Sequence, residues 1–123
     1  MLGRRLNLPV LNLGFDGNGK AEPEVAELLG TLSPAIYVID CLPNLMPAEA
    51  PKVEAFVATI RAARPSTPIL LVENLHYPDG ILNVTRRDRY VASNRILRAI
   101  YERLSRHDKN LHYLPADNFL GAD

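Results

Sequence analysis

Four short apolar runs, each followed by a polar or glycine-rich loop, constrain the fold of this 123-residue chain more than any other feature. They cover residues 9–13, residues 35–40, Ile69–Val72 and Leu111–Leu114. Short runs that are apolar at consecutive positions are typical of strands buried on both faces of a parallel sheet. The segments between them are long enough for the helical crossovers that parallel strands require. The sequence therefore predicts an α/β fold.

Helix signals fill the segments between these runs. Residues 22–30 begin with acids and Pro23 and end at Gly30, as helices commonly do. A second helix is predicted to run to about Arg64, because apolar residues recur at helical spacing in Val53, Phe56, Val57 and Ile60. A short helical turn is also expected over Leu2–Leu6, before the first apolar run.

The longest helix is expected to follow a polar loop at residues 73–84. Thr85 can cap its start, with Asp88 three residues later in an arrangement that resembles a capping box. Its buried stripe is predicted at Tyr90, Leu97, Ile100, Tyr101 and Leu104. Its arginines are most simply explained as a solvated face: Arg86, Arg87, Arg89, Arg95, Arg98 and Arg103.

The order of these elements predicts a flavodoxin-like α/β/α sandwich, in which a parallel sheet carries helices on both faces. Because the carboxyl ends of parallel strands meet at one edge, the loops that follow them should converge on one cleft. The loops concerned are residues 16–19, 40–44, 73–76 and 116–118.

Composition excludes several classes of function. Fourteen basic residues balance fourteen acidic residues, so the chain has no electrostatic footprint for nucleic acid or an anionic membrane. The single cysteine, Cys41, excludes an internal disulfide framework and a cysteine-based zinc site. No apolar run approaches the roughly 20 residues that a membrane span needs. We therefore expect a globular domain whose partner is a small molecule, without a metal or cofactor, and the sequence leaves compartment and oligomeric state open.

The glycine-rich loop at residues 14–20 is the first candidate site, since it matches the pattern G-x-x-x-x-G-K of phosphate-binding loops. Two features argue against phosphate. Ala21 stands where a hydroxyl would bind the metal, and Glu22, Glu24 and Glu27 place negative charge on the helix turn that would face the phosphate. A tight strand-to-helix turn without any ligand is the remaining alternative for this loop.

Acyl transfer is the second hypothesis for the same edge of the sheet. A hydrolase that cleaves esters must place hydrogen-bond donors around the oxyanion of its tetrahedral intermediate. A glycine backbone N–H and an asparagine side-chain amide can supply such a pair, and Gly17 and Asn44 both follow predicted strands. These two residues are therefore candidate donors.

Two stretches resemble sequence blocks of the SGNH (GDSL-like) hydrolase superfamily: Asn12-Leu-Gly-Phe-Asp-Gly17 is similar to the second block and Asp40-Cys-Leu-Pro-Asn44 to the third. The likeness covers most of the chain, including Leu70-Leu-Val-Glu-Asn74 and the helix that follows. It implies a flavodoxin-like fold, esterase or acyl hydrolase activity on a carbohydrate or lipid ester, and an oxyanion hole that includes Gly17 and Asn44. The third block usually reads Gly-x-Asn-Asp, so here the asparagine is retained without its usual neighbours.

The resemblance also implies catalytic parts that these residues do not contain. The family's nucleophilic serine belongs to a strand before Leu2, between residues 9–13 and 35–40 in the sheet, and its Asp-x-x-His pair belongs after Asp123. Residues 1–123 are thus interpreted as one truncated domain that is inactive by itself. The chain's own serines are predicted at the opposite edge or inside a helix: Ser33, Ser66, Ser93 and Ser105. A non-catalytic ligand-binding module, or a degenerate homologue, is the alternative interpretation.

Other polar residues near the predicted cleft allow two interpretations each. Asp16, Asn18 and His76 are candidate substrate contacts, although a loop histidine can simply be solvated. Asp40 can either orient its loop through backbone hydrogen bonds or contact a ligand. Cys41 is expected to be a small buried side chain and not a nucleophile, because no histidine is predicted near it. His107 and His112 are expected at the surface.

Overall fold

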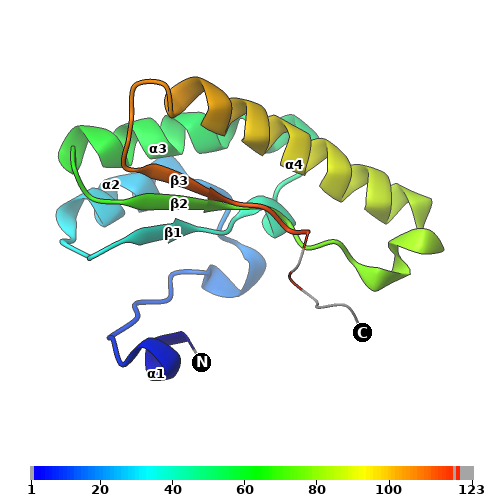
Figure 1. The fold of residues 1–123 in the computed structure, drawn as a ribbon, viewed down its shortest axis with the longest axis horizontal. Coiled ribbons are helices and arrows are strands. Elements are labelled where there is room, and N and C mark those ends of the chain that lie inside the picture. The colour runs from blue at the N-terminus through cyan, green and yellow to red at the C-terminus, as the bar shows by residue number, and fades with distance from the viewer. Residues whose placement is uncertain (1, 118, 120–123) are drawn as a thin grey trace.

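The computed structural model describes residues 2–117 and residue 119, and shows a small α/β fold (Figure 1). Its strands form one parallel sheet in the order β1-β2-β3. The strands are β1 (Tyr37–Ile39), β2 (Ile69–Val72) and β3 (Leu111–Leu114), and the helices are α1 (Leu2–Leu6), α2 (Pro23–Thr31), α3 (Lys52–Ala63) and α4 (Val84–Leu104). The predicted fold class is therefore confirmed, and the helix boundaries agree with those expected to within a few residues.

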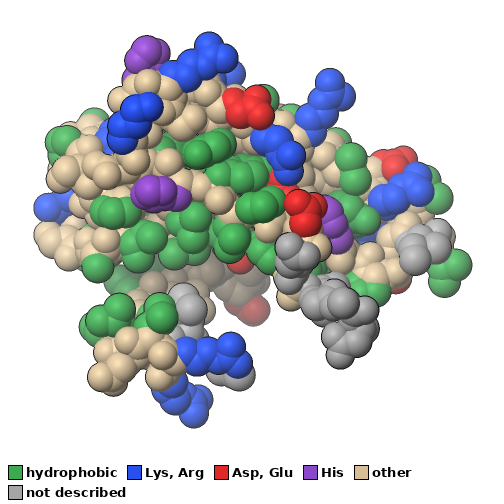
Figure 2. Space-filling model, in the orientation of Figure 1, with side chains coloured by type: hydrophobic (Ala, Val, Ile, Leu, Met, Phe, Trp, Pro, Cys, Tyr) green, Lys and Arg blue, Asp and Glu red, His purple; other side chains and the backbone are tan. Residues whose placement is uncertain are grey.

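The hydrophobic core lies on one face of this sheet. The strand register places Tyr37, Ile69 and Leu111 in one row, and these side chains are all buried. In the next row Val38 is 48% exposed and His112 is also exposed, and Figure 2 shows hydrophobic side chains gathered over the strands on this side. Within the described residues, β1 is thus an edge strand with one open face, whereas the sequence indicated a central strand covered on both sides.

The prediction of a first strand at residues 9–13 is wrong. This segment has no strand structure, and its Val10 and Leu11 side chains are 55% and 68% exposed. It lies with α1 beyond β1, apart from the other helices (Figure 1). A strand exists only when its backbone pairs with a neighbour, and β1 is hydrogen-bonded to β2 alone. Residues 9–13 therefore have no ladder partner in the described structure, and the strand expected between them and β1 stays a prediction.

The start and the buried face of α4 also differ from expectation. Asn83 and not Thr85 caps the helix, because its Oδ1 atom accepts a hydrogen bond of 3.0 Å from the Arg86 N–H. Of the predicted stripe, Tyr90, Leu97 and Ile100 are buried, while Tyr101 and Leu104 are half-buried. The buried face also contains Ser93 and Asn94. Hydrophobic periodicity alone misses such polar positions. No described helix combines the length and apolar character that crossing a membrane requires.

Close contact between α2 and α3 depends on a glycine. A Cβ atom added to Gly30 would lie 2.9 Å from the Cβ of Ala63, a distance that real Cβ atoms essentially never show. Ala63 cannot relieve this contact by rotating, because its Cβ is fixed to the backbone. Arg64 crosses the same junction, donating from Nε to the Gly30 carbonyl at 3.0 Å.

Gly30→Ala is therefore expected to destabilise the protein by about 1–3 kcal/mol through overpacking. Helix propensity alone predicts the opposite sign, a gain of about 0.8–1.0 kcal/mol. Urea unfolding of the single variant and of Gly30→Ala/Ala63→Gly provides the measurement, since the second change removes the clash. A single variant as stable as the wild type would contradict the packing argument.

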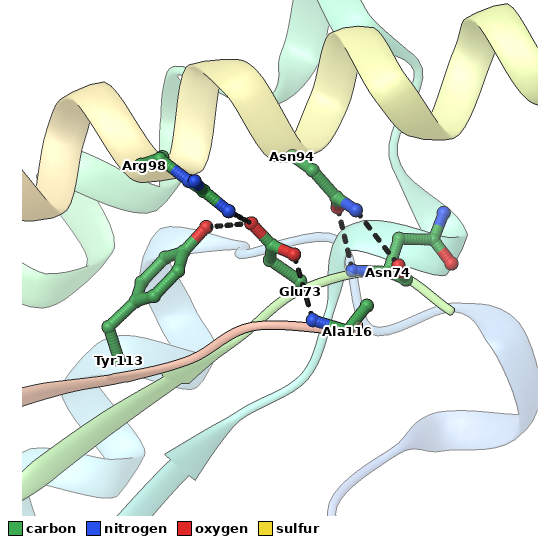
Figure 3. Close-up of polar contacts among 6 residues, drawn as sticks. All are labelled: Glu73, Asn74, Asn94, Arg98, Tyr113 and Ala116. Carbon is green, nitrogen blue, oxygen red and sulfur yellow. Dashed lines mark hydrogen bonds and ion pairs between the residues drawn. The ribbon is translucent and has the colours of Figure 1, made fainter. Parts of the chain in front are cut away.

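A buried carboxylate joins the ends of β2 and β3 to α4 (Figure 3). Glu73, directly after β2, is 2% exposed. It accepts hydrogen bonds from the Arg98 guanidinium at 2.9 Å, the Ala116 N–H at 2.8 Å and the Tyr113 hydroxyl. Burial by itself raises the pKa of Glu73, but these three donors outweigh it and hold the pKa below its ordinary value. The carboxylate is thus kept ionised inside the protein.

Glu73→Gln is expected to lower the free energy of unfolding at neutral pH by about 2–3 kcal/mol, because hydrogen bonds to a charged acceptor are lost. Glu54→Gln is a matched control, because Glu54 pairs with Arg103 at the exposed surface and should change stability by less than about 0.5 kcal/mol.

The lowered pKa also fixes the sign of the pH dependence. The contribution of Glu73 is fully present above the pKa of an unfolded glutamate, about 4.3, and is lost as the pH falls through the lower pKa of the folded state. The stability gap between wild type and Glu73→Gln should therefore narrow in acid unfolding curves. A gap that stays constant down to the acid transition would exclude this role.

Candidate functional site

The glycine-rich loop folds into a tight left-handed turn at the C-terminal edge of the sheet. Residues Phe15–Gly17 form a single 3-10 turn, η1, in which Gly17 has φ +84°. Phe15 and Asp16 also have positive φ values, 48° and 49°, which residues other than glycine rarely adopt. Just before this turn, the Gly14 N–H donates to Oδ1 of Asn12 at 2.9 Å. Non-glycine residues kept in such conformations are frequent at functional sites.

Asn44 lies directly against this turn. It ends a second 3-10 turn, η2 (Leu42–Asn44), which is anchored by the fully buried side chains of Leu42 and Leu45. Its Nδ2 atom donates to the Gly19 carbonyl at 3.1 Å, and a Cβ added to Gly17 would lie 3.9 Å from its Oδ1 atom. The structure thus brings together the two residues that the sequence analysis selected. Since a primary amide has two N–H groups, one donor of Asn44 remains beyond the bond to Gly19.

Arg89 of α4 fixes the backbone on both sides of Asn44. Its Nη2 atom donates to the Pro43 carbonyl at 3.0 Å and to the Leu45 carbonyl at 3.3 Å. The assignment of Arg89 to a solvated face is therefore wrong, whereas Arg98 is exposed as predicted even though its guanidinium also donates to Glu73. Helical periodicity cannot identify such arginines, because their long side chains reach from the helix flank to partners that are distant in sequence.

The end of β2 is fixed by two asparagines. Oδ1 of Asn94 accepts from the Asn74 N–H at 2.8 Å, and its Nδ2 atom donates to the Asn74 carbonyl at 2.9 Å (Figure 3). Both residues are buried. The sequence analysis did not select either residue. The sequence did contain one signal for these contacts, the polar pair Glu73-Asn74 directly after a buried strand. Buried polar groups need hydrogen-bond partners, so such a pair indicates partners elsewhere in the chain.

Asp40 and Cys41, which follow β1, differ in their chemistry. The protein atoms packed around Asp40 raise the pKa of its carboxyl group above the ordinary value, although the residue keeps a surface open to solvent. Burial, assisted by the negative charges of Asp40 and Glu22, raises the pKa of the Cys41 thiol to about 12. Cys41 is therefore protonated at neutral pH and packs against the core, as expected for a small apolar side chain and not for a nucleophile.

The remaining candidates lie around this centre. Asp16 and Asn18, which flank Gly17, are exposed. His76 is also exposed, and its ring stacks on Tyr90 of α4 with 5.2 Å between centroids. Asn118, expected at the same edge, lies outside the described residues. His107 and His112 are exposed, as predicted.

The loop geometry does not support phosphate binding. The first helical position of α2 is Pro23, which has no N–H to donate, and Glu24 follows in the first turn. The carboxylate of Glu22 accepts a 2.7 Å hydrogen bond from the Lys20 N–H, so negative charge occupies the place where a phosphate would need donors. In the part of the chain that the structure describes, no group of three or more His, Cys, Asp or Glu side chains could hold a metal ion.

Two solved structures resemble this fold. One is a protein from Bacteroides ovatus described as a GDSL-like lipase, with a TM-score of 0.80, 36% identity, and coverage of 87% of this chain and 32% of that one. The other is the salicylyl-acyltransferase of a tetracycline biosynthetic pathway, with a TM-score of 0.74, 24% identity, and coverage of 93% and 35%. The chain therefore spans about a third of the length of these relatives. None of the curated proteins searched matches the sequence.

The family model named GDSL-like lipase/acylhydrolase matches residues 1–123. The match extends over the η1 turn, the η2 turn with Asn44 and the strands that position them. The chain belongs to the GDSL-like lipase/acylhydrolase family.

Proposed function

We propose that this chain forms part of an ester-cleaving acyl hydrolase, in which the Gly17 N–H and the Asn44 amide stabilise the oxyanion. The single observation that carries this proposal is the position of the Asn44 side chain beside the left-handed turn at Gly17, where its Nδ2 atom donates to the Gly19 carbonyl. Membership of the acylhydrolase family supports the same chemistry. Asp16, Asn18 and His76 are proposed as contacts for the rest of the substrate.

The proposed reaction assigns these residues a purely electrostatic role. A serine hydroxyl outside residues 1–123 attacks the ester carbonyl carbon, and an Asp–His pair, also outside, takes its proton. The carbonyl oxygen becomes negatively charged in the tetrahedral intermediate, where donors that are already in position stabilise it without reorganising. The ester C–O bond then breaks, so that the alcohol leaves with the proton and the acyl group stays on the serine oxygen. Water attacks this acyl-serine in the same way and releases the acid and the free serine. Transfer of the acyl group to another hydroxyl would use the same donors.

Residues 1–123 produced alone are expected to show no esterase activity. Ser33, Ser66 and Ser105 follow helices α2, α3 and α4 on the way to the next strand, so they belong to the edge opposite Asn44, and Ser93 is completely buried in α4. The donors without a nucleophile leave only weak residual catalysis. Hydrolysis of p-nitrophenyl acetate is the measurement. Turnover that persists through purification and disappears with one Ser→Ala change among these four would disprove the expectation.

In the full-length protein, Asn44→Ala is expected to lower kcat by roughly 10²–10³-fold with little change in KM. The amide acts on charge that develops only in the transition state, so substrate binding should be nearly unaffected. The variant also loses the hydrogen bond to the Gly19 carbonyl, which should cost about 1 kcal/mol of stability.

Asn12→Ala is the matched control for this experiment. Asn12 also makes one hydrogen bond to the backbone of the same loop, so the variant should lose a similar amount of stability while kcat stays within a few-fold of the wild type. Melting curves and steady-state kinetics separate the two roles. If Asn44→Ala folds and its kcat equals that of Asn12→Ala, Asn44 is structural, and a non-catalytic binding module becomes the better interpretation.

A further inference from the structure

The η2 turn that carries Asn44 is held only weakly by its own hydrogen bonds. The Asn44 N–H donates to the Cys41 carbonyl at 3.0 Å, and the Leu45 N–H donates to the Leu42 carbonyl at 3.1 Å. Bonds of this 3-10 type have poorer geometry than those of an α-helix, and here a single turn contains both of them. The direction in which the Asn44 side chain leaves this turn therefore depends on contacts from outside it.

Arg89 of α4 supplies such a contact by bridging the turn across Asn44. One guanidinium nitrogen, Nη2, donates to the Pro43 carbonyl at 3.0 Å and to the Leu45 carbonyl at 3.3 Å. The Pro43 carbonyl and the Asn44 N–H belong to the same planar peptide unit. This unit is therefore held at both ends, by Arg89 at its oxygen and by the turn at its nitrogen. The bridge thus fixes the backbone from which the Asn44 amide projects.

Arg89 differs from its neighbours on α4 in what its guanidinium binds. Four other arginines of this helix each pair with a carboxylate: Arg86, Arg87, Arg98 and Arg103. Among the described residues, Arg89 instead pairs with backbone carbonyl groups alone. Its Nε atom is buried without a hydrogen-bond partner, which costs free energy. A costly contact of this kind indicates a functional role for the bridge, beyond stability.

We propose that Arg89 is a positioning residue for the oxyanion hole, which acts through the backbone of η2 to keep the Asn44 amide aimed at the oxyanion. The proposal rests on the function proposed above. A displacement of about 1 Å at a reacting centre can lower a rate by about 100-fold. Leu42 and Leu45 are fully buried and keep the turn in place without Arg89. Loss of the guanidinium should therefore disturb the orientation of Asn44 without unfolding the turn.

Arg89→Met tests this proposal in the full-length protein, because it keeps an apolar stem and removes the guanidinium. Its kcat for p-nitrophenyl acetate should fall roughly 10–100-fold with little change in KM, since the amide acts on charge that develops only in the transition state. Arg64→Met is the matched control. The Arg64 guanidinium also donates to two backbone carbonyls of another element, those of Gly30 and Thr31 at the end of α2. This control should lose similar stability and keep kcat within a few-fold of the wild type.

The double variant Arg89→Met/Asn44→Ala shows whether Arg89 acts through Asn44. If it does, the kcat of the double variant should lie within about threefold of that of Asn44→Ala, because no amide is left to orient. A kcat lowered by the product of the two single effects would mean that Arg89 acts on the reaction independently, for example through its charge. That result would overturn the positioning role.

The side-chain amide signals of Asn44 in NMR spectra give a readout that does not need turnover, and they are assigned by their absence from Asn44→Ala. They should shift or broaden in Arg89→Met and stay unchanged in Arg64→Met. Unchanged signals in Arg89→Met, or a kcat equal to that of Arg64→Met, overturn the proposal. The function proposed above is judged separately, since it stands if Asn44→Ala alone lowers kcat and fails if it does not.

Discussion

The structure depends on one buried carboxylate at the end of its central strand. Glu73 gathers a guanidinium from α4, a hydroxyl from β3 and a backbone N–H from the segment after β3. Each of these donors comes from a different part of the chain, so one ionised group sets the position of three elements. The next residue, Asn74, is fixed by Asn94 of the same helix. The end of β2 at the proposed site is thus held rigidly, because nearly all of its polar groups are hydrogen-bonded.

The turn that carries Asn44 is held in place by apolar packing and by an arginine. Asn44 lies in a turn whose neighbouring leucines are buried and whose carbonyl groups are held by Arg89. The glycine turn it faces belongs to a segment without regular pairing, and the bond from Asn44 to the Gly19 carbonyl is what connects the two. A preorganised donor is effective because it is oriented before charge develops. The contacts that hold Asn44 therefore belong to the proposed catalytic machinery as much as Asn44 itself.

The sequence predicted the elements whose signal is local. The apolar runs of β2 and β3 and the spacing of Val53, Phe56, Val57 and Ile60 are such signals, and the fold class followed from their order. The prediction of a strand at residues 9–13 failed because a strand needs a hydrogen-bonded neighbour, which composition does not reveal. Gly17 and Asn44 could be selected through a family resemblance, but Arg89 and Asn74 could not. Their importance comes from partners distant in sequence, and only three-dimensional contacts show them.

The open edge of β1 has a consequence for the behaviour of these residues in concentrated solution. Its backbone N–H and C=O groups on that side have no strand beside them in the described structure, and the stretch Ala35-Ile-Tyr-Val-Ile39 contains neither a charge nor a proline. Natural proteins usually protect such edges with lysines, prolines or bulges. This edge instead offers a template on which another copy can extend the sheet. Intermolecular strand pairing, and not the loss of the core, is therefore the route by which this unit would precipitate.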